Sequence, residues 1–126
     1  DGFYLRDAAR SLEPNGLRTW RQIPEVEAWC ACFDVLQVNE DEVAMLAADP
    51  LGLAAKALAA GVRTLFVTMG KRGVVYFEDA GVGRPLRTAL VPASVARVEG
   101  AGDPTGCGDV WGATYFSRAV AGDTLE

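Results

Sequence analysis

Residues 34 to 68 read DVLQVNEDEVAMLAADPLGLAAKALAAGVRTLFVT, and this stretch decides the fold. Short apolar runs stand at its ends, from Asp34 to Val38 and from Val62 to Thr68, with alanine-rich helical sequence between them. The second run contains an unbroken Leu-Phe-Val triplet, which is typical of a parallel strand covered on both faces. The sequence therefore predicts a β-α-β unit, whose crossover should be right-handed.

The helical sequence of this unit divides at Pro50. One piece runs from Asn39 to Ala48, and a second runs from Leu51 to Ala60 and is closed by Gly61. A further helix is predicted from Pro24, which suits a first helical position. The apolar residues that recur at helical spacing after it are Val26, Trp29, Cys30 and Phe33.

The pattern changes after Thr68. Only the stretch Met69 to Arg72 separates it from the β-rich residues Gly73 to Glu78, which predicts a hairpin. Gly and Pro turns then separate two further predicted strands, Arg87 to Val91 and Val95 to Val98. The sheet should therefore be antiparallel at this edge.

The chain is expected to begin in a strand end and loop and to finish in a helix. Residues 1 to 23 contain a turn cluster at Glu13 to Gly16, and the last helix runs from beyond Gly106 to about Ala121. Apolar residues point in nearly all directions from this helix, so it must be buried. They are Val110, Trp111, Ala113, Tyr115, Phe116, Ala119 and Val120. Because little sequence remains to cover them, we expect the chain to be part of a larger protein.

Composition narrows the classes of partner. The 126 residues are 50% apolar, which suits one domain with one core. A net charge of −5 without a basic run argues against nucleic acid and anionic membranes, so an anionic ligand needs a metal ion or backbone amides. No apolar stretch approaches the roughly 20 residues of a membrane span and no signal peptide opens the sequence, so the expected location is cytoplasmic. The sparse cysteines, Cys30, Cys32 and Cys107, do not have zinc-site spacing.

A glycine-rich segment, GAGDPTGCGD, occupies residues 100 to 109. If the last helix starts near Gly106, the amides of Cys107, Gly108 and Asp109 and the helix dipole form a site for a phosphoryl oxygen. The Asp109 carboxylate would repel a resident phosphate but suits a transient one, because it can take the proton from an attacking hydroxyl. A simpler alternative stays open, in which the dipole favours this carboxylate and the glycines only form turns.

Two other phosphate-binding motifs fit less well. Gly100, Gly102 and Gly106 are spaced G-x-G-x-x-x-G, which departs from the dinucleotide fingerprint and disfavours a nicotinamide-dependent dehydrogenase. A P-loop is excluded because no Gly-Lys-Ser/Thr follows.

The stretch DPTGCGD, Asp103 to Asp109, resembles the second signature, D-T-T-G-A-G-D, of the ribokinase-like carbohydrate kinases, also called the phosphofructokinase-B family. The resemblance implies that Asp109 is the catalytic base and that Asp103 and Thr105 help to bind a monovalent cation such as K⁺. It also implies an anion hole made by Gly106, Cys107 and Gly108. The departures from the family pattern are Pro104, Cys107, Trp111 and Thr114.

The stretch Asn39-Glu40-Asp41-Glu42 follows a predicted strand and opens a helix. An Asn with a Glu three positions later is typical of an N-cap, and capping alone could explain it. The family carries N-x-x-E at this place, so the resemblance implies that Asn39 and Glu42 organise Mg²⁺ through its waters. An acidic protein that binds ATP needs such a cation, and the two roles can coexist.

The stretch Thr68 to Gly73, TMGKRG, taken alone could be an ordinary hairpin loop. The family has T-x-G-x-x-G here, so the resemblance implies that Thr68 and Gly70 border the phosphates and sugar of the nucleotide. Lys71 and Arg72 stand beside them, although exposed loop cations are usually only solvated.

The pattern of strands and helices predicts an α/β fold with a parallel central sheet and an antiparallel edge hairpin. The resemblance carried by the three motifs implies that this is part of the ribokinase-like three-layer αβα sandwich. Residues 1–126 would form a single partial domain, the C-terminal part of the kinase domain, without its lid and N-terminal half. The resemblance implies Mg²⁺-dependent transfer of the γ-phosphoryl group of ATP to a hydroxyl of a sugar or sugar-like substrate.

Several points stay open in the sequence. The acceptor site is missing, so we expect this stretch alone to be inactive. The resemblance allows a homodimer, and it leaves ribose, fructose, a keto-sugar acid or a nucleoside as the acceptor. A non-catalytic nucleotide-binding or regulatory protein of the same fold is the alternative from another class.

Overall fold

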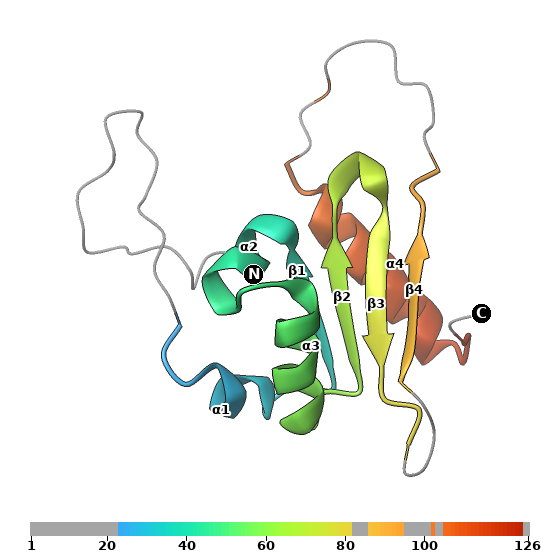
Figure 1. Ribbon diagram of the computed structural model, residues 1–126. Helices are drawn as coiled ribbons and strands as arrows, with labels where there is room; N and C mark the ends of the chain where they lie inside the picture. Colours follow the sequence, from blue (N-terminus) through green and yellow to red (C-terminus); the bar gives the residue numbers. More distant parts are fainter. Residues whose placement is uncertain (1–22, 82–85, 95–101, 103–104, 125–126) are drawn as a thin grey trace, which may run out of the picture. The chain divides into compact units, whose positions relative to one another are not determined.

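The computed structural model describes residues 23–81, 86–94, 102 and 105–124 (Figure 1). They belong to two units, residues 1–93 and 94–126. Three predictions lie outside the described residues: the turn near the beginning of the chain, the strand Val95 to Val98 and the position of Asp103.

A mixed sheet forms the frame of the first unit. Within the described residues it has four strands, in the order β1-β2-β3-β4. The strands are β1 (Val35–Asn39), β2 (Thr64–Thr68), β3 (Val74–Glu78) and β4 (Arg87–Val91). β1 and β2 are parallel, whereas β3 pairs antiparallel with both β2 and β4. The predicted α/β class, with a parallel pair and an antiparallel hairpin, is confirmed.

The connection from β1 to β2 is helical, which confirms the β-α-β unit. It contains α2 (Glu40–Leu46) and α3 (Pro50–Ala59). Asp49 caps α3 by accepting a hydrogen bond of 2.7 Å from the Gly52 amide, and Pro50 follows as the first helical residue. Pro50 therefore both separates the helices and starts the second one, as its fixed φ and missing N–H favour.

The helix predicted from Pro24 is shorter than expected, because α1 comprises Val26–Cys30. Glu25 precedes it in the left-handed region, with φ +54°, so the chain is still turning there. After the helix, the Phe33 amide donates to the Cys30 carbonyl over 3.0 Å, which forms a tight turn before β1. Phe33 consequently lies outside the apolar face of the helix and is 40% exposed.

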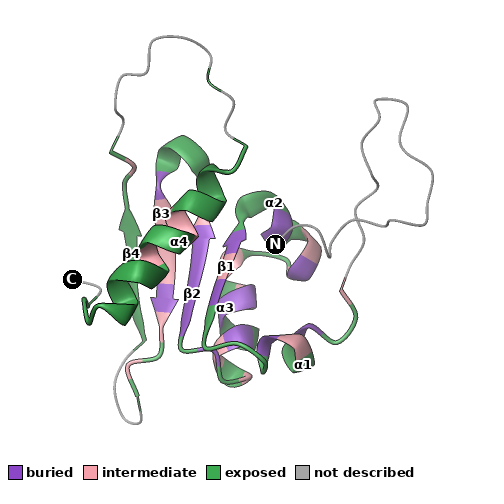
Figure 2. Ribbon diagram, turned by 180° about the vertical axis from the view of Figure 1, so that it is seen from behind, coloured by how far each residue is buried: buried purple, intermediate pink, exposed green. Residues whose placement is uncertain are grey.

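The core of the first unit lies between one face of the sheet and its helices (Figure 2). α2 contacts β1 and β2, and α3 contacts β2. The members of this core on the strands and on α2 and α3 include Leu36, Val38, Leu65, Val67, Phe77, Val43, Leu46 and Leu53. β2 is buried from Thr64 to Val67, which agrees with the unbroken apolar run in its sequence.

Gly73 lies close against a second backbone segment in the hairpin region. It follows the short 3₁₀ helix η1 (Gly70–Arg72) and has φ +102°. A Cβ atom at this position would lie 2.0 Å from the Val91 carbonyl oxygen. Only glycine fits here, because any side chain would collide with the backbone after β4.

The second unit contains α4 (Cys107–Val120), with Gly106 as its N-cap. These bounds confirm the helix predicted from the sequence. Trp111 and Tyr115 stack one turn apart, with ring centroids 5.9 Å from each other. None of the residues of α4 is buried in the described part of the chain, so the predicted burial of this helix is not seen there. A helix that is apolar on all sides needs covering surfaces on all sides, and α4 leaves Val110, Phe116 and Val120 exposed.

No helix in the described ranges is both long and apolar enough to cross a bilayer.

Replacing Gly73 by Ala should lower the free energy of unfolding by about 2–4 kcal/mol, because the substitution adds a backbone clash to an unfavourable φ. Urea unfolding of the protein measures this loss. Gly61→Ala is the matched control: its φ is +105°, but a Cβ there would meet nothing within 4 Å. We expect the control to lose only about 1–2 kcal/mol. Equal losses in both variants would show that the contact with Val91 is unimportant.

Candidate nucleotide and metal site

Two of the sequence motifs meet at the carboxyl ends of β1 and β2. Asn39 is the last residue of β1, Thr68 is the last residue of β2, and the two are direct partners in the parallel ladder. The segments that follow them, the start of α2 and η1, therefore leave the sheet at the same edge. In open α/β sheets, ligands bind in the crevice outside the carboxyl ends of the strands.

Asn39 and Glu42 form a reciprocal capping box at the start of α2. The Asn39 side-chain oxygen accepts from the Glu42 amide at 2.9 Å, and Glu42 Oε2 accepts from the Asn39 amide at 2.9 Å. The capping interpretation is therefore confirmed. Glu42 is 8% exposed, so these bonds hold both side chains in fixed positions at the strand end.

The capping box leaves one carboxylate oxygen of Glu42 available to bind a cation or its waters. Glu42 Oε1 makes no hydrogen bond in the described part of the chain. The described residues also contain no group of three or more His, Cys, Asp or Glu that could hold a metal directly. One carboxylate oxygen and an amide side chain are too few for a protein cage, but they suit Mg²⁺, which usually keeps several of its waters.

In the loop after β2, the backbone has open space beside Gly70 and none beside Gly73. The Thr68 hydroxyl donates to the Val38 carbonyl over 3.4 Å, across the two parallel strands. Gly70 has φ +54°, and a Cβ there would meet nothing within 4 Å. Gly73, in contrast, is packed against the backbone beyond β4. The structure thus requires Gly73 for packing, whereas the space beside Gly70 is open.

An ion pair that the sequence did not predict connects the two motifs. Arg72, the last residue of η1, pairs with Glu40, the first residue of α2. They are 32 positions apart, so their contact could only be found once the parallel register was known. Arg72 is therefore not simply solvated, and Lys71 is the exposed cation of this loop that forms no ion pair in the described residues.

The third motif lies at the start of α4. The Val110 amide donates to the Gly106 carbonyl over 3.0 Å, so Asp109 belongs to the first turn of the helix. Its side chain is exposed, and Thr105 precedes the helix in a turn. This position fits both interpretations of the carboxylate, as a base and as a favourable charge near the helix dipole. That its carboxylate faces the loop from Thr68 to Gly70 remains a prediction.

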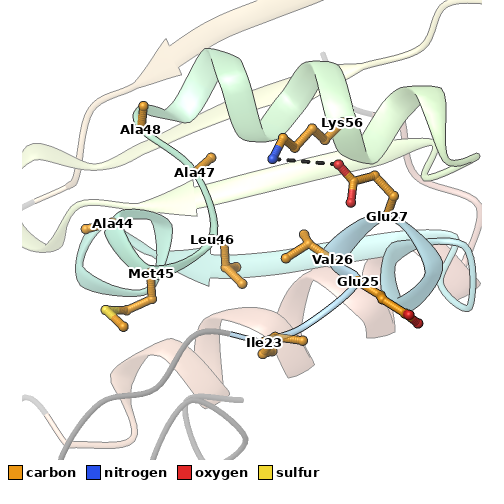
Figure 3. Close-up of a pocket in the computed structure, with 10 residues that line it drawn as sticks. All are labelled: Ile23, Glu25, Val26, Glu27, Ala44, Met45, Leu46, Ala47, Ala48 and Lys56. Atoms are coloured by element: carbon orange, nitrogen blue, oxygen red, sulfur yellow. Dashed lines mark ion pairs between the residues drawn. The ribbon is translucent and has the colours of Figure 1, made fainter.

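A separate cavity of about 510 Å³ lies among α1, α3 and the segment that ends α2 (Figure 3). Apolar side chains such as Val26, Met45 and Leu46 line it, and the Lys56–Glu27 ion pair of 3.6 Å stands at its border. None of the residues of the three motifs lines this cavity.

Comparisons with known proteins agree with the fold. Two solved structures are similar: a ribokinase from Thermotoga maritima and a PfkB protein from Polaromonas. The first is 25% identical with a TM-score of 0.62 and matches 78% of this chain and 32% of its own. The second is 21% identical with a TM-score of 0.56, and the match covers 90% of this chain and 35% of its own. At that identity, the likeness is evidence for the fold only. The chain thus spans about a third of the length of either structure.

No curated protein sequence matches the chain. The family model described as "pfkB family carbohydrate kinase", however, matches residues 6–126. That match covers all three motifs, including the paired strand ends at Asn39 and Thr68. The chain therefore belongs to the pfkB family of carbohydrate kinases.

Proposed function

We propose that the protein containing this chain transfers the γ-phosphoryl group of ATP to a hydroxyl of a sugar or sugar-like substrate. The observation that carries the proposal is the direct pairing of Asn39 with Thr68, which brings the N-x-x-E and T-x-G-x-x-G motifs together at one edge of the sheet. The family match over residues 6–126 supports it. Because the chain spans about a third of its structural relatives, the acceptor-binding residues belong to the remaining length in this proposal.

Asp109 is the general base in the proposed reaction. Its carboxylate takes the proton of the acceptor hydroxyl while that oxygen bonds to the γ-phosphorus, and the bond from phosphorus to the β–γ bridging oxygen breaks to release ADP. The N-terminus of α4, at Gly106 to Gly108, stabilises the negative charge on the phosphoryl oxygens in transit. A base of this kind contributes roughly 10²- to 10⁴-fold to the rate.

Asn39 and Glu42 hold Mg²⁺ through its waters in this proposal, and Thr68 and Gly70 border the nucleotide. The capping box fixes the first two side chains, which supports their role in orienting water. When bound, Mg²⁺ supplies positive charge to the β- and γ-phosphate oxygens. Asp103 and Thr105 are proposed to contribute to a K⁺ site.

Replacing Asp109 by Asn in the whole protein should leave ATP binding nearly intact and lower turnover at least about a hundredfold, because the base is lost without a large change in shape. Calorimetric titration with Mg-ATP and a kinase assay over a panel of sugars measure the two effects. Asp123→Asn, beyond the other end of α4, is the matched control. Ordinary turnover in the Asp109 variant would exclude its role as base. Mg-ATP binding without transfer by the wild-type protein would favour a non-catalytic nucleotide-binding protein.

Asn39→Ser separates the cap from the metal role. Serine also caps helices, so the unfolding free energy should fall by no more than about 0.5 kcal/mol, against about 0.5–2 kcal/mol for Asn39→Ala. Loss of the amide group should raise the Mg²⁺ concentration needed for half-maximal turnover about tenfold or more. Magnesium titration of the kinase activity checks this. An unchanged Mg²⁺ requirement in the serine variant would reduce Asn39 to a helix cap.

A further inference from the structure

We propose that Arg72 is a positioning residue for the nucleotide, acting through its ion pair with Glu40. The pair holds the loop Thr68 to Gly73 against the start of α2, so that the two motifs keep a fixed distance when Mg-ATP binds. This inference rests on the proposed function.

The places of the two residues in the fold give the pair this role. Nη2 of Arg72 contacts Oε2 of Glu40. Glu40 directly follows Asn39, the cap of α2, and Arg72 ends the short helix that begins at Gly70. The ion pair therefore joins the segment proposed to organise Mg²⁺ to the segment proposed to border the phosphates.

Other bonds shape this loop but do not attach it to α2. The Met69 amide donates to the Gly73 carbonyl at 2.8 Å, and the Gly73 amide donates to the Gly70 carbonyl at 3.1 Å. Both bonds lie within the loop. The Thr68 hydroxyl reaches only the Val38 carbonyl of β1, over 3.4 Å. Arg72 thus extends the connection from the strands to the helix.

Charge separates the positioning role from direct binding of phosphate by Arg72. The first turn of α2 carries three carboxylates, Glu40, Asp41 and Glu42. On charge alone, removal of Glu40 should help a polyanion to bind at this edge. An Arg72 that contacted phosphate directly would also be released by that removal. The positioning role predicts the opposite, because the loop would lose its attachment.

The expected effect is modest, because the side chains of Arg72 and Glu40 are 66% and 48% exposed. Exposed ion pairs contribute little, so Glu40→Gln and Arg72→Gln should each raise the Kd for Mg-ATP by about twofold to fivefold. The double variant should be no weaker than either single one, since all three lack the same contact. Arg72→Lys, which keeps the charge, should recover most of the affinity.

Calorimetric titration of the whole protein with Mg-ATP tests the inference without need of an acceptor. Asp41→Asn is the matched control, because it removes a neighbouring carboxylate that forms no ion pair in the described residues. The affinity of this variant for Mg-ATP should equal or exceed that of the wild-type protein. In the kinase assay, the KM for ATP should rise in both single variants with kcat nearly unchanged. A purely structural role would not raise the KM for ATP while leaving kcat unchanged.

The outcomes distinguish this inference from the proposed function. Unchanged or tighter binding in Glu40→Gln, or a double variant weaker than both single ones, overturns the positioning role and leaves the kinase proposal intact. Wild-type binding of Mg-ATP without transfer to any acceptor overturns the kinase proposal alone. A wild-type protein that does not bind Mg-ATP overturns both.

Discussion

The parallel pairing of β1 with β2 is the constraint on which the rest of the structure depends. It sets Asn39 beside Thr68, and both motifs of the first unit begin at that pair. The register is fixed because every second side chain of a strand faces the core. Leu36 and Val38 of β1 pack in the same core as Leu65 and Val67 of β2. A slip of one residue would turn those apolar side chains away from the helices and would separate the motifs. Burial in the core therefore fixes the geometry of the candidate site.

The site residues show that one side chain can serve structure and chemistry together. Asn39 and Glu42 form a complete capping box, yet the same bonds hold an amide and a carboxylate at the strand end where a hydrated cation would be oriented. In the next loop, by contrast, the two glycines have different surroundings. Gly73 allows the backbone after β4 to pass, whereas Gly70 leaves open space. A local structural explanation thus does not exclude a functional one.

Much of the fold could be predicted because it depends on local patterns. The bounds of β4 agree with the expected strand at both ends, since turn residues flank a short apolar run. Errors arose where chain geometry overrides pattern: α1 ends at Cys30 because the chain must turn into β1, and Phe33 is left outside. The contact of Arg72 with Glu40 could not be predicted, because it needs the register of two distant strands. The residues of the three motifs were identified because the motifs follow one another along the sequence in the order of the family. Their chemical roles remain a proposal.

Amide NMR spectra of the whole protein, recorded with Mg²⁺ and a non-hydrolysable ATP analogue, test the central claim most directly. If the ends of β1 and β2 form the nucleotide and metal site, the largest shift changes should fall on Asn39 to Glu42 and on Thr68 to Gly73, together with Gly106 to Asp109. Shift changes that leave the first two segments untouched, and gather instead around the cavity lined by Met45 and Leu46, would contradict the account.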